Sequence, residues 1–318
     1  MSIRRAYAVN QWKPNFDDFC RPDAHLRAFK TVRAAGFRAV ELRGGTGRWD
    51  PLGRPASIEA TYGSLSTFAK VLADVGLDGV SSWSVDPGEP VDEELSHGRS
   101  VLDRGQHAAI VEWARPFAAA LAELGGSRLV VRALPPAWQV GTVDDDAVDT
   151  AAACFDALGA ATAEHGVRTT LHADVLSAAA DADVLARLLA ATDPALVGLT
   201  VDTGELTLAG LDAADVVRRH VDRVDHLQLK DTRFVDTAGE RLRPHAEHAF
   251  LTAGGDREVE RWFHEVGTRD GLVDAPAVLD VLRGNGYDGW VVFESEQTPN
   301  PASTVMLNGW YAKHRLGL

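Results

Sequence analysis

The sequence predicts a (β/α)₈ barrel that takes up the whole chain. Short runs of β-branched and apolar residues alternate with long alanine- and leucine-rich amphipathic stretches, a pattern typical of βαβ units around a parallel sheet. Eight such repeats follow one another, and no linker or low-complexity tract divides them. The chain has 318 residues, a length at which barrels are commonly built as one unit. We therefore expect a single catalytic domain over residues 1–318.

The repeats can be placed element by element. The expected strands span residues 4–10, 38–43, 77–83, 127–133, 167–173, 197–202, 223–230 and 289–295. The expected helices span residues 23–35, 64–75, 105–124, 146–165, 178–191, 212–220, 274–285 and 301–315. Five of the helices end at a glycine just before the next strand, where a left-handed residue stops a helix at no side-chain cost: Gly36, Gly76, Gly125, Gly166 and Gly286.

One long irregular stretch, 232–272, separates the seventh strand from its helix. A loop of that length in a compact domain is usually functional or carries small elements of its own. In a barrel it would lie at the carboxyl ends of the strands, where active sites are built. We therefore expect it to form a lid.

Composition narrows the class of partner. The formal net charge of −14 disfavours nucleic acid, because a phosphate backbone would be repelled by the average field. The sequence contains no run of 18 or more apolar residues, so we expect no membrane partner. The N-terminus lacks the apolar region of a signal peptide. Only two cysteines occur, which fits a reducing, cytoplasmic location. A homo-oligomer remains open.

Polar side chains fall on one parity of the last four strands. Side chains alternate along a strand, so residues two apart share the face toward the barrel axis. The residues on that face are Thr170, His172 and Asp174; Thr200 and Asp202; His226, Gln228 and Lys230; and Val292, Glu294 and Glu296. The opposite parity is apolar, as packing against surrounding helices requires: Leu171, Val201, Leu227, Leu229 and Phe293.

Four successive strand ends therefore aim polar groups at one region. Buried carboxylates must be paired or coordinate a cation. One divalent ion held by His172, Asp202, Gln228 and Glu294 would satisfy all four strands at once. Mixed nitrogen and oxygen ligation suits Mn²⁺, Mg²⁺, Co²⁺ or Zn²⁺. The alternative is a metal-free hydrogen-bond network with Lys230 and nearby arginines.

Several segments carry a family resemblance. The stretch TDPALVGLTVDTG at 192–204 resembles the sixth-strand region of the xylose isomerase-like sugar isomerase/epimerase superfamily. The stretches HVDRVDHLQLKD at 220–231, GYDGWVVFESEQ at 286–297 and GFRAVEL at 36–42 strengthen the resemblance. Within the superfamily the chain looks closest to inosose dehydratases. The resemblance is specific from about residue 165 onward.

The resemblance implies one divalent metal and a set of ligands. Asp202 matches the aspartate ligand, Glu294 the last glutamate, and Gln228 the position of a histidine or glutamine. His172 falls where most members have the first glutamate, and Glu205 stands where the sixth-strand motif usually has a histidine. These two differences from the family pattern bear on which reaction is catalysed and on how tightly the metal is bound.

The implied chemistry is proton abstraction next to a carbonyl, with a metal-stabilised enediolate. Glu294 would act as the base, and Lys230 would steady the oxyanion or protonate a leaving hydroxyl, with His226 as a further catalytic candidate. Lys230 could instead form a structural salt bridge. Because His172 lies opposite Glu294, we expect dehydration of a keto-cyclitol or keto–aldose isomerisation. The alternatives are a ketose epimerase and a catalytically inactive sugar-binding barrel. The apurinic-endonuclease branch of the superfamily is disfavoured, because strands two to four offer too few inward-facing residues for its trinuclear zinc site.

The substrate is expected to be a small sugar or cyclitol, with or without a phosphate. Tryptophans that follow strands could pack on the apolar face of a sugar ring, although ordinary loop packing is an equally simple use. The candidate substrate-binding residues are Trp12, Trp83, Glu41, Glu205, Arg233 and Glu265.

Overall fold

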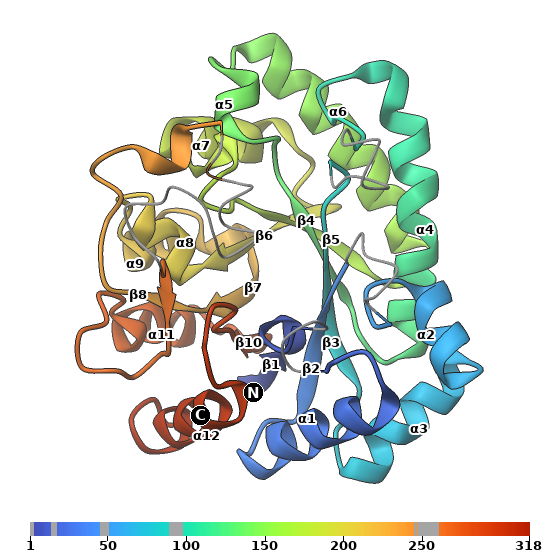
Figure 1. The fold of residues 1–318 in the computed structure, drawn as a ribbon. Coiled ribbons are helices and arrows are strands. Elements are labelled where there is room, and N and C mark those ends of the chain that lie inside the picture. The colour runs from blue at the N-terminus through green and yellow to red at the C-terminus, as the bar shows by residue number, and fades with distance from the viewer. Residues whose placement is uncertain (1–2, 14–17, 45–50, 89–97, 245, 247–260) are drawn as a thin grey trace.

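A computed structural model describes residues 3–13, 18–44, 51–88, 98–244, 246 and 261–318. Its centre is a closed barrel of parallel strands in the order β1-β10-β7-β6-β5-β4-β3-β2, with helices around the outside (Figure 1). The predicted (β/α)₈ barrel is therefore confirmed. The barrel strands are β1 (Arg4–Ala8), β2 (Ala39–Arg43), β3 (Val80–Val85), β4 (Arg128–Arg132), β5 (Arg168–His172), β6 (Val197–Asp202), β7 (Val224–Leu229) and β10 (Trp290–Phe293).

The helices follow the strands in the predicted alternation. They are α1 (Pro22–Ala34), α2 (Pro55–Tyr62), α3 (Leu65–Val75), α4 (His107–Glu123), α5 (Ala137–Val140), α6 (Asp145–Ala163), α7 (Ala182–Ala191), α8 (Thr203–Leu208), α9 (Ala213–Arg219), α11 (Ala275–Gly284) and α12 (Pro301–His314). Each of the eight predicted helical stretches contains a helix, and α2, α5 and α8 were not predicted. The predicted terminal glycines have positive φ, for example +89° at Gly76 and +75° at Gly286.

Alternation along the strands divides the core into two parts. Residues of the apolar parity, such as Leu171, Val201 and Phe293, belong to the large cluster that includes apolar residues of the outer helices. A separate small cluster of buried residues on the opposite parity consists of Ala6, Ala8, Ala39, Trp290 and Val292. Small alanines suit this parity because a narrow barrel has little interior room. The polar groups are thus concentrated toward the carboxyl ends of the strands.

The predicted position of Trp83, in a loop after the third strand, was wrong. Strand β3 extends to Val85, so Trp83 lies within the strand and not in a loop beyond it. Its side chain is fully buried, and its ring packs edge-on at 5.2 Å between centroids against Phe117 of α4. Trp83 therefore packs against the helical layer and is not part of the cavity lining.

The long stretch 232–272 contains two short strands in its described part. Strands β8 (Asp231–Thr232) and β9 (Phe263–His264) pair in an antiparallel fashion. Residues 245 and 247–260 lie outside the described residues, so the expected lid is not tested over them. No helix among the described residues has both the length and the apolar character needed to cross a membrane.

Candidate active site

A cavity opens at the carboxyl ends of the barrel strands. Its lining includes three of the four predicted metal ligands together with Lys230 and Glu41: Ala8, Asn10, Glu41, Leu42, Arg43, Ser84, His172, Gln228, Lys230 and Glu294. The fourth predicted ligand, Asp202, is 1% exposed, and its Oδ2 lies 3.7 Å from Nε2 of His172. The structure therefore brings the four predicted ligands to one end of the barrel.

Strand register explains how these side chains meet. Asp202 of β6 is the register partner of Gln228 on β7, and Thr200 pairs in the same way with His172 of β5. Asp202 ends its strand and also caps helix α8, because its Oδ1 accepts hydrogen bonds from the backbone N–H groups of Gly204 and Glu205, both at 3.1 Å. One carboxylate oxygen thus holds the helix while the other faces the site.

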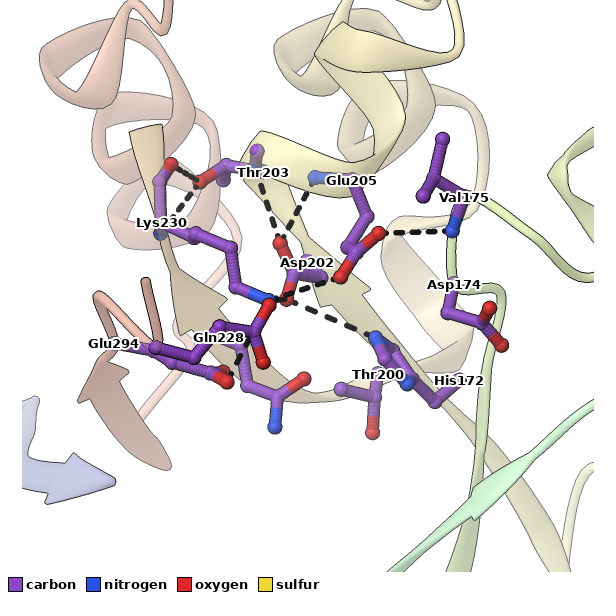
Figure 2. A network of polar contacts seen from close by, with 12 residues as sticks. His172, Asp174, Val175, Thr200, Asp202, Thr203, Glu205, Gln228, Lys230 and Glu294 are labelled. Atoms are coloured by element: carbon purple, nitrogen blue, oxygen red, sulfur yellow. Dashed lines mark hydrogen bonds and ion pairs between the residues drawn. The ribbon is translucent and has the colours of Figure 1, made fainter. Parts of the chain in front are cut away.

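The ammonium group of Lys230 lies among four carboxylates, of which Asp202, Glu205 and Glu294 are labelled in Figure 2. Its Nζ is 2.9 Å from Glu205, 3.0 Å from Glu296, 3.1 Å from Asp202 and 3.5 Å from Glu294. The side chain is almost completely buried, and the ring of Phe263 lies 4.4 Å from the ammonium on another side. The salt bridge considered as an alternative for Lys230 is therefore present, with several acids at once.

Negative charge at the site is only partly neutralised. Burial, together with Glu296 and Asp202, raises the pKa of Glu294 to about 8 although Lys230 acts in the opposite direction. Burial likewise raises the pKa of Glu205 to about 7. Burial would also raise the pKa of Glu296, but Lys230, Arg43 and Lys13 outweigh it and hold that pKa at about 2. A buried acid that holds its proton so strongly indicates that another positive charge would be favourable here.

Two predicted ligands have a buried polar atom without a hydrogen-bond partner among the described residues. These atoms are Nε2 of His172 and Oε1 of Gln228, whereas the buried Oδ2 of Asp202 lies 3.1 Å from the Lys230 ammonium. Buried polar atoms are normally satisfied, so such a group of exceptions at one site calls for a ligand, a water or an ion. Imidazole, carboxylate and amide oxygen are also donors that a divalent cation accepts. The donor set therefore fits a cation.

The described residues do not form a ready-made metal cluster, however. No three His, Cys, Asp or Glu side chains among them are grouped closely enough to hold an ion. Two features account for this: one of the four predicted ligands is an amide, and the Lys230 ammonium lies in contact with both Asp202 and Glu294. Lys230 thus places a positive charge beside Asp202 and Glu294, the same two carboxylates that would bind the cation.

Glu41 and His226 lie deeper than expected. Glu41 is 3% exposed, and its carboxylate accepts hydrogen bonds from His226, Gln228 and Ser82. His226 is completely buried, lies 2.9 Å from Glu41 and is not part of the cavity lining. His226 thus contacts Glu41 and not the cavity, and its catalytic role stays a prediction.

The other predicted contacts lie outside the cavity lining. Glu205 is buried, and its second oxygen accepts the backbone N–H of Val175 at 2.9 Å. Trp12 packs on Tyr7 and Phe19, and Glu265 is bonded to Arg261 and Thr298. Arg233 is exposed. None of these four residues lines the cavity, so their roles as substrate contacts stay predictions.

Four residues at the site were missed from the sequence as site residues. The amide of Asn10 donates to Glu294 and Glu296, Ser82 donates to Glu41 at 2.6 Å, and Phe263 covers Lys230. Glu296 was recognised as inward-facing but was given no role. Asn10 shares its parity with Ala6 and Ala8, so the rule applied to the last four strands would have found it in the first. Nothing in the sequence indicates Phe263, because it comes from the long loop.

Comparisons with known proteins agree with this architecture. The family described as Xylose isomerase-like TIM barrel matches residues 29–311. Inosose dehydratase of Lacticaseibacillus casei is 31% identical over 159 residues, which is 50% of this chain and 50% of that protein. The chain therefore matches about half the length of its curated relatives.

Solved structures share the fold over nearly the whole chain. A sugar phosphate isomerase/epimerase from Parabacteroides distasonis has a TM-score of 0.70 at 16% identity and covers 98% of both chains. A probable 3-DHS dehydratase from Bacillus anthracis has a TM-score of 0.72 at 11% identity and covers 98% of this chain and 100% of its own. At these identities the likeness concerns the fold alone.

Proposed function

The chain belongs to the xylose isomerase-like TIM barrel family, and from this premise we propose that it removes a proton next to the carbonyl of a sugar or cyclitol. The leading reaction is the dehydration of a keto-cyclitol. A single observation carries the proposal: at one end of the barrel, Lys230 and Glu294 line a cavity with His172 and Gln228, and Asp202 lies beside them. Titratable groups gathered in a cleft of this kind are typical of active sites.

One divalent cation belongs to the proposal. His172, Asp202, Gln228 and Glu294 would hold it, and Mn²⁺, Mg²⁺, Co²⁺ and Zn²⁺ are all compatible with these donors. When bound, the cation supplies a Lewis acid that polarises the substrate carbonyl and makes the neighbouring C–H bond more acidic.

The protein's own groups would carry out the proton transfers. The Glu294 carboxylate takes the proton from the carbon beside the carbonyl, and the electron pair of that C–H bond forms the new double bond. The hydroxyl on the next carbon leaves with the electrons of its C–O bond, and the Lys230 ammonium protonates it to water. Asn10, which donates to Glu294, would hold the carboxylate in place. Phe263 covers Lys230 and would limit access of bulk water.

Two observations favour dehydration over epimerisation. Epimerisation of the kind that the family resemblance implies needs a glutamate on each face of the sugar, whereas the fifth strand here ends in His172. Inosose dehydratases are also among the relatives with about 31% identity. Isomerisation and epimerisation remain outcomes that the experiment below separates from dehydration.

The test is to incubate the purified protein and Mn²⁺ with a panel of inososes and ketoses in D₂O and to follow each compound by mass spectrometry. Loss of water from an inosose is the expected result. Deuterium uptake without loss of water would replace the dehydratase by an isomerase or epimerase. A panel left wholly unchanged would favour the inactive sugar-binding barrel.

The same assay tests Glu294 as the base. Glu294→Gln should abolish both water loss and deuterium exchange, because an amide cannot accept the proton. Glu123→Gln on the exposed end of α4 is the matched control and should leave both unchanged. Exchange that persists in Glu294→Gln would assign the base to another residue.

A further inference from the structure

Glu41 joins parts of the barrel that are distant in strand order. It comes from β2, whereas Gln228 and His226 come from β7, and β1 and β10 lie between these strands. The Glu41 carboxylate reaches across the interior at 3% exposure. Its Oε1 accepts from Nε2 of Gln228 at 2.6 Å. Its Oε2 accepts from Ser82 at 2.6 Å and lies 2.9 Å from Nε2 of His226.

These contacts decide which way the Gln228 amide points. A primary amide has a donor end and an acceptor end, and the two differ little in size, so packing alone hardly distinguishes the two orientations. A carboxylate that receives hydrogen bonds on both oxygens can only accept. It therefore takes the NH₂ end of Gln228 and leaves Oε1 on the opposite side, and this buried oxygen has no hydrogen-bond partner in the part of the chain that the structure describes. Gln228 also lines the cavity.

We propose that Glu41 is a positioning residue that holds Gln228 with its carbonyl oxygen toward the cavity, as an oxygen ligand for the cation. The inference rests on the proposed function, because it gives that cation one of its donors. It also changes the part expected for Glu41, which would act on Gln228 beside it in the cavity lining and not on the substrate.

Glu41→Gln reverses the direction of this hydrogen bond. The Oε1 atom of the new glutamine would accept from Ser82 and His226, so its NH₂ would face residue 228. Gln228 would then turn its own oxygen toward residue 41 and present its NH₂ to the cavity. An NH₂ group cannot ligate a cation. Supporting groups of this kind typically change metal affinity by about 10- to 100-fold.

The experiment is a double-mutant cycle on the full chain, read as the Kd of Mn²⁺ by calorimetry and as the visible spectrum of bound Co²⁺. Glu41→Gln should weaken Mn²⁺ binding at least about tenfold and change the Co²⁺ spectrum. In a Gln228→Ala background the same substitution should change the Kd less than about twofold, because the residue through which Glu41 acts is absent. Ser82→Ala is the matched control: it removes one hydrogen bond from Glu41 but leaves the bond to Gln228, and it should bind Mn²⁺ nearly as the wild type does.

Each outcome has one meaning. An equal loss of affinity from Glu41→Gln in both backgrounds would overturn the inference and leave the proposed cation site standing, since the effect would be one of charge. Unchanged affinity in Glu41→Gln would overturn it in the same way. A wild-type protein that takes up neither Mn²⁺ nor Co²⁺ overturns the cation site itself, and this is read from the wild type alone. Thermal unfolding of each variant without metal verifies that it is folded.

Discussion

The His25 side chain is a buried base. It belongs to α1 and is completely buried, and its Nδ1 lies 2.6 Å from the hydroxyl of Tyr62. Phe19 packs edge-on against the ring. Burial lowers the pKa of His25 to about 4. The folded protein therefore keeps this imidazole neutral in a pH range where a free histidine takes up a proton.

This shift predicts a loss of stability in acid. Between about pH 6.5 and pH 4 the unfolded chain binds a proton at His25 that the folded chain does not, so the free energy of unfolding falls as the pH falls. From pH 7 to pH 5 the wild type should lose about 1–2 kcal/mol more than His25→Gln, in which this position no longer titrates. Urea denaturation of both proteins at the two pH values measures the difference. Parallel losses in the two proteins would refute the assignment.

Single residues of the site were predictable where the backbone alone decides. The period of two along a strand fixes which side chains face the barrel axis. It predicted that His172, Asp202, Lys230 and Glu294 face inward, and the structure brings them together at the carboxyl ends of the strands. Contacts between distant strands do not follow from that period. The depth of Glu41 and its bond to Gln228 depend on the diameter of the closed barrel and on the length of each side chain, which no local pattern contains.

At the scale of elements, the short helix α8 is tightly coupled to Lys230. A Cβ built on Gly204 would lie 2.9 Å from Cγ and 3.1 Å from the backbone carbon of Lys230. The hydroxyl of Thr203 also donates to the Lys230 carbonyl at 2.6 Å and accepts from its backbone N–H at 3.0 Å. The first turn of α8 thus fixes the backbone of Lys230 and leaves little free space beside the start of its side chain.

Gly204→Ala should therefore impair catalysis by displacing Lys230. We expect at least a tenfold loss of turnover and a stability cost of about 1–3 kcal/mol, as for other overpacked sites. Gly284→Ala near the end of α11 is the matched control, since a Cβ there has no neighbour within 4 Å. It should keep full activity and be equally or slightly more stable, because alanine favours helix by up to about 1 kcal/mol. Normal turnover in Gly204→Ala would show that the position of Lys230 tolerates a shift.

The elements themselves were predictable in proportion to their length. Helices such as α4 and α6 carry several turns of apolar periodicity and were found within two residues of their ends. The four- to eight-residue helices α2, α5 and α8 are too short to show a period. Asp202 caps helix α8, and this structural role was not predicted for it alongside its role as a ligand.

At the scale of the whole molecule, a bound cation should stabilise the fold. A ligand at 100 times its Kd adds about 2.7 kcal/mol, and each kcal/mol raises the Tm of a domain of this length by roughly 1.5 °C. Saturating Mn²⁺ should therefore raise the Tm by about 4 °C.

Asp202→Asn gives the matched comparison for this measurement. The asparagine oxygen can still cap α8, but the charge beside the cavity is removed. Its Tm should respond much less to Mn²⁺. Equal shifts in the two proteins would place the ion elsewhere on this acidic chain, whose net charge is −14.

The global architecture followed from the repeat count alone. Eight alternating strands and helices leave few topologies other than a closed parallel barrel, and the observed strand order is the one that sequential right-handed crossovers produce. The long stretch 232–272 could be located but not folded from its sequence, because its described strands β8 and β9 pair only with one another.

The bond between Glu41 and Gln228 has a consequence for dividing the gene. Every proposed cation ligand is encoded after residue 165, whereas Asn10, Glu41 and Ser82 are encoded before residue 86. A polypeptide that starts between β4 and β5 would contain all four proposed ligands but would lack Glu41, which orients Gln228. Two co-expressed fragments cut between β4 and β5 should regain cation binding only on reassociation, so the halves of this barrel are complementary parts and not autonomous modules.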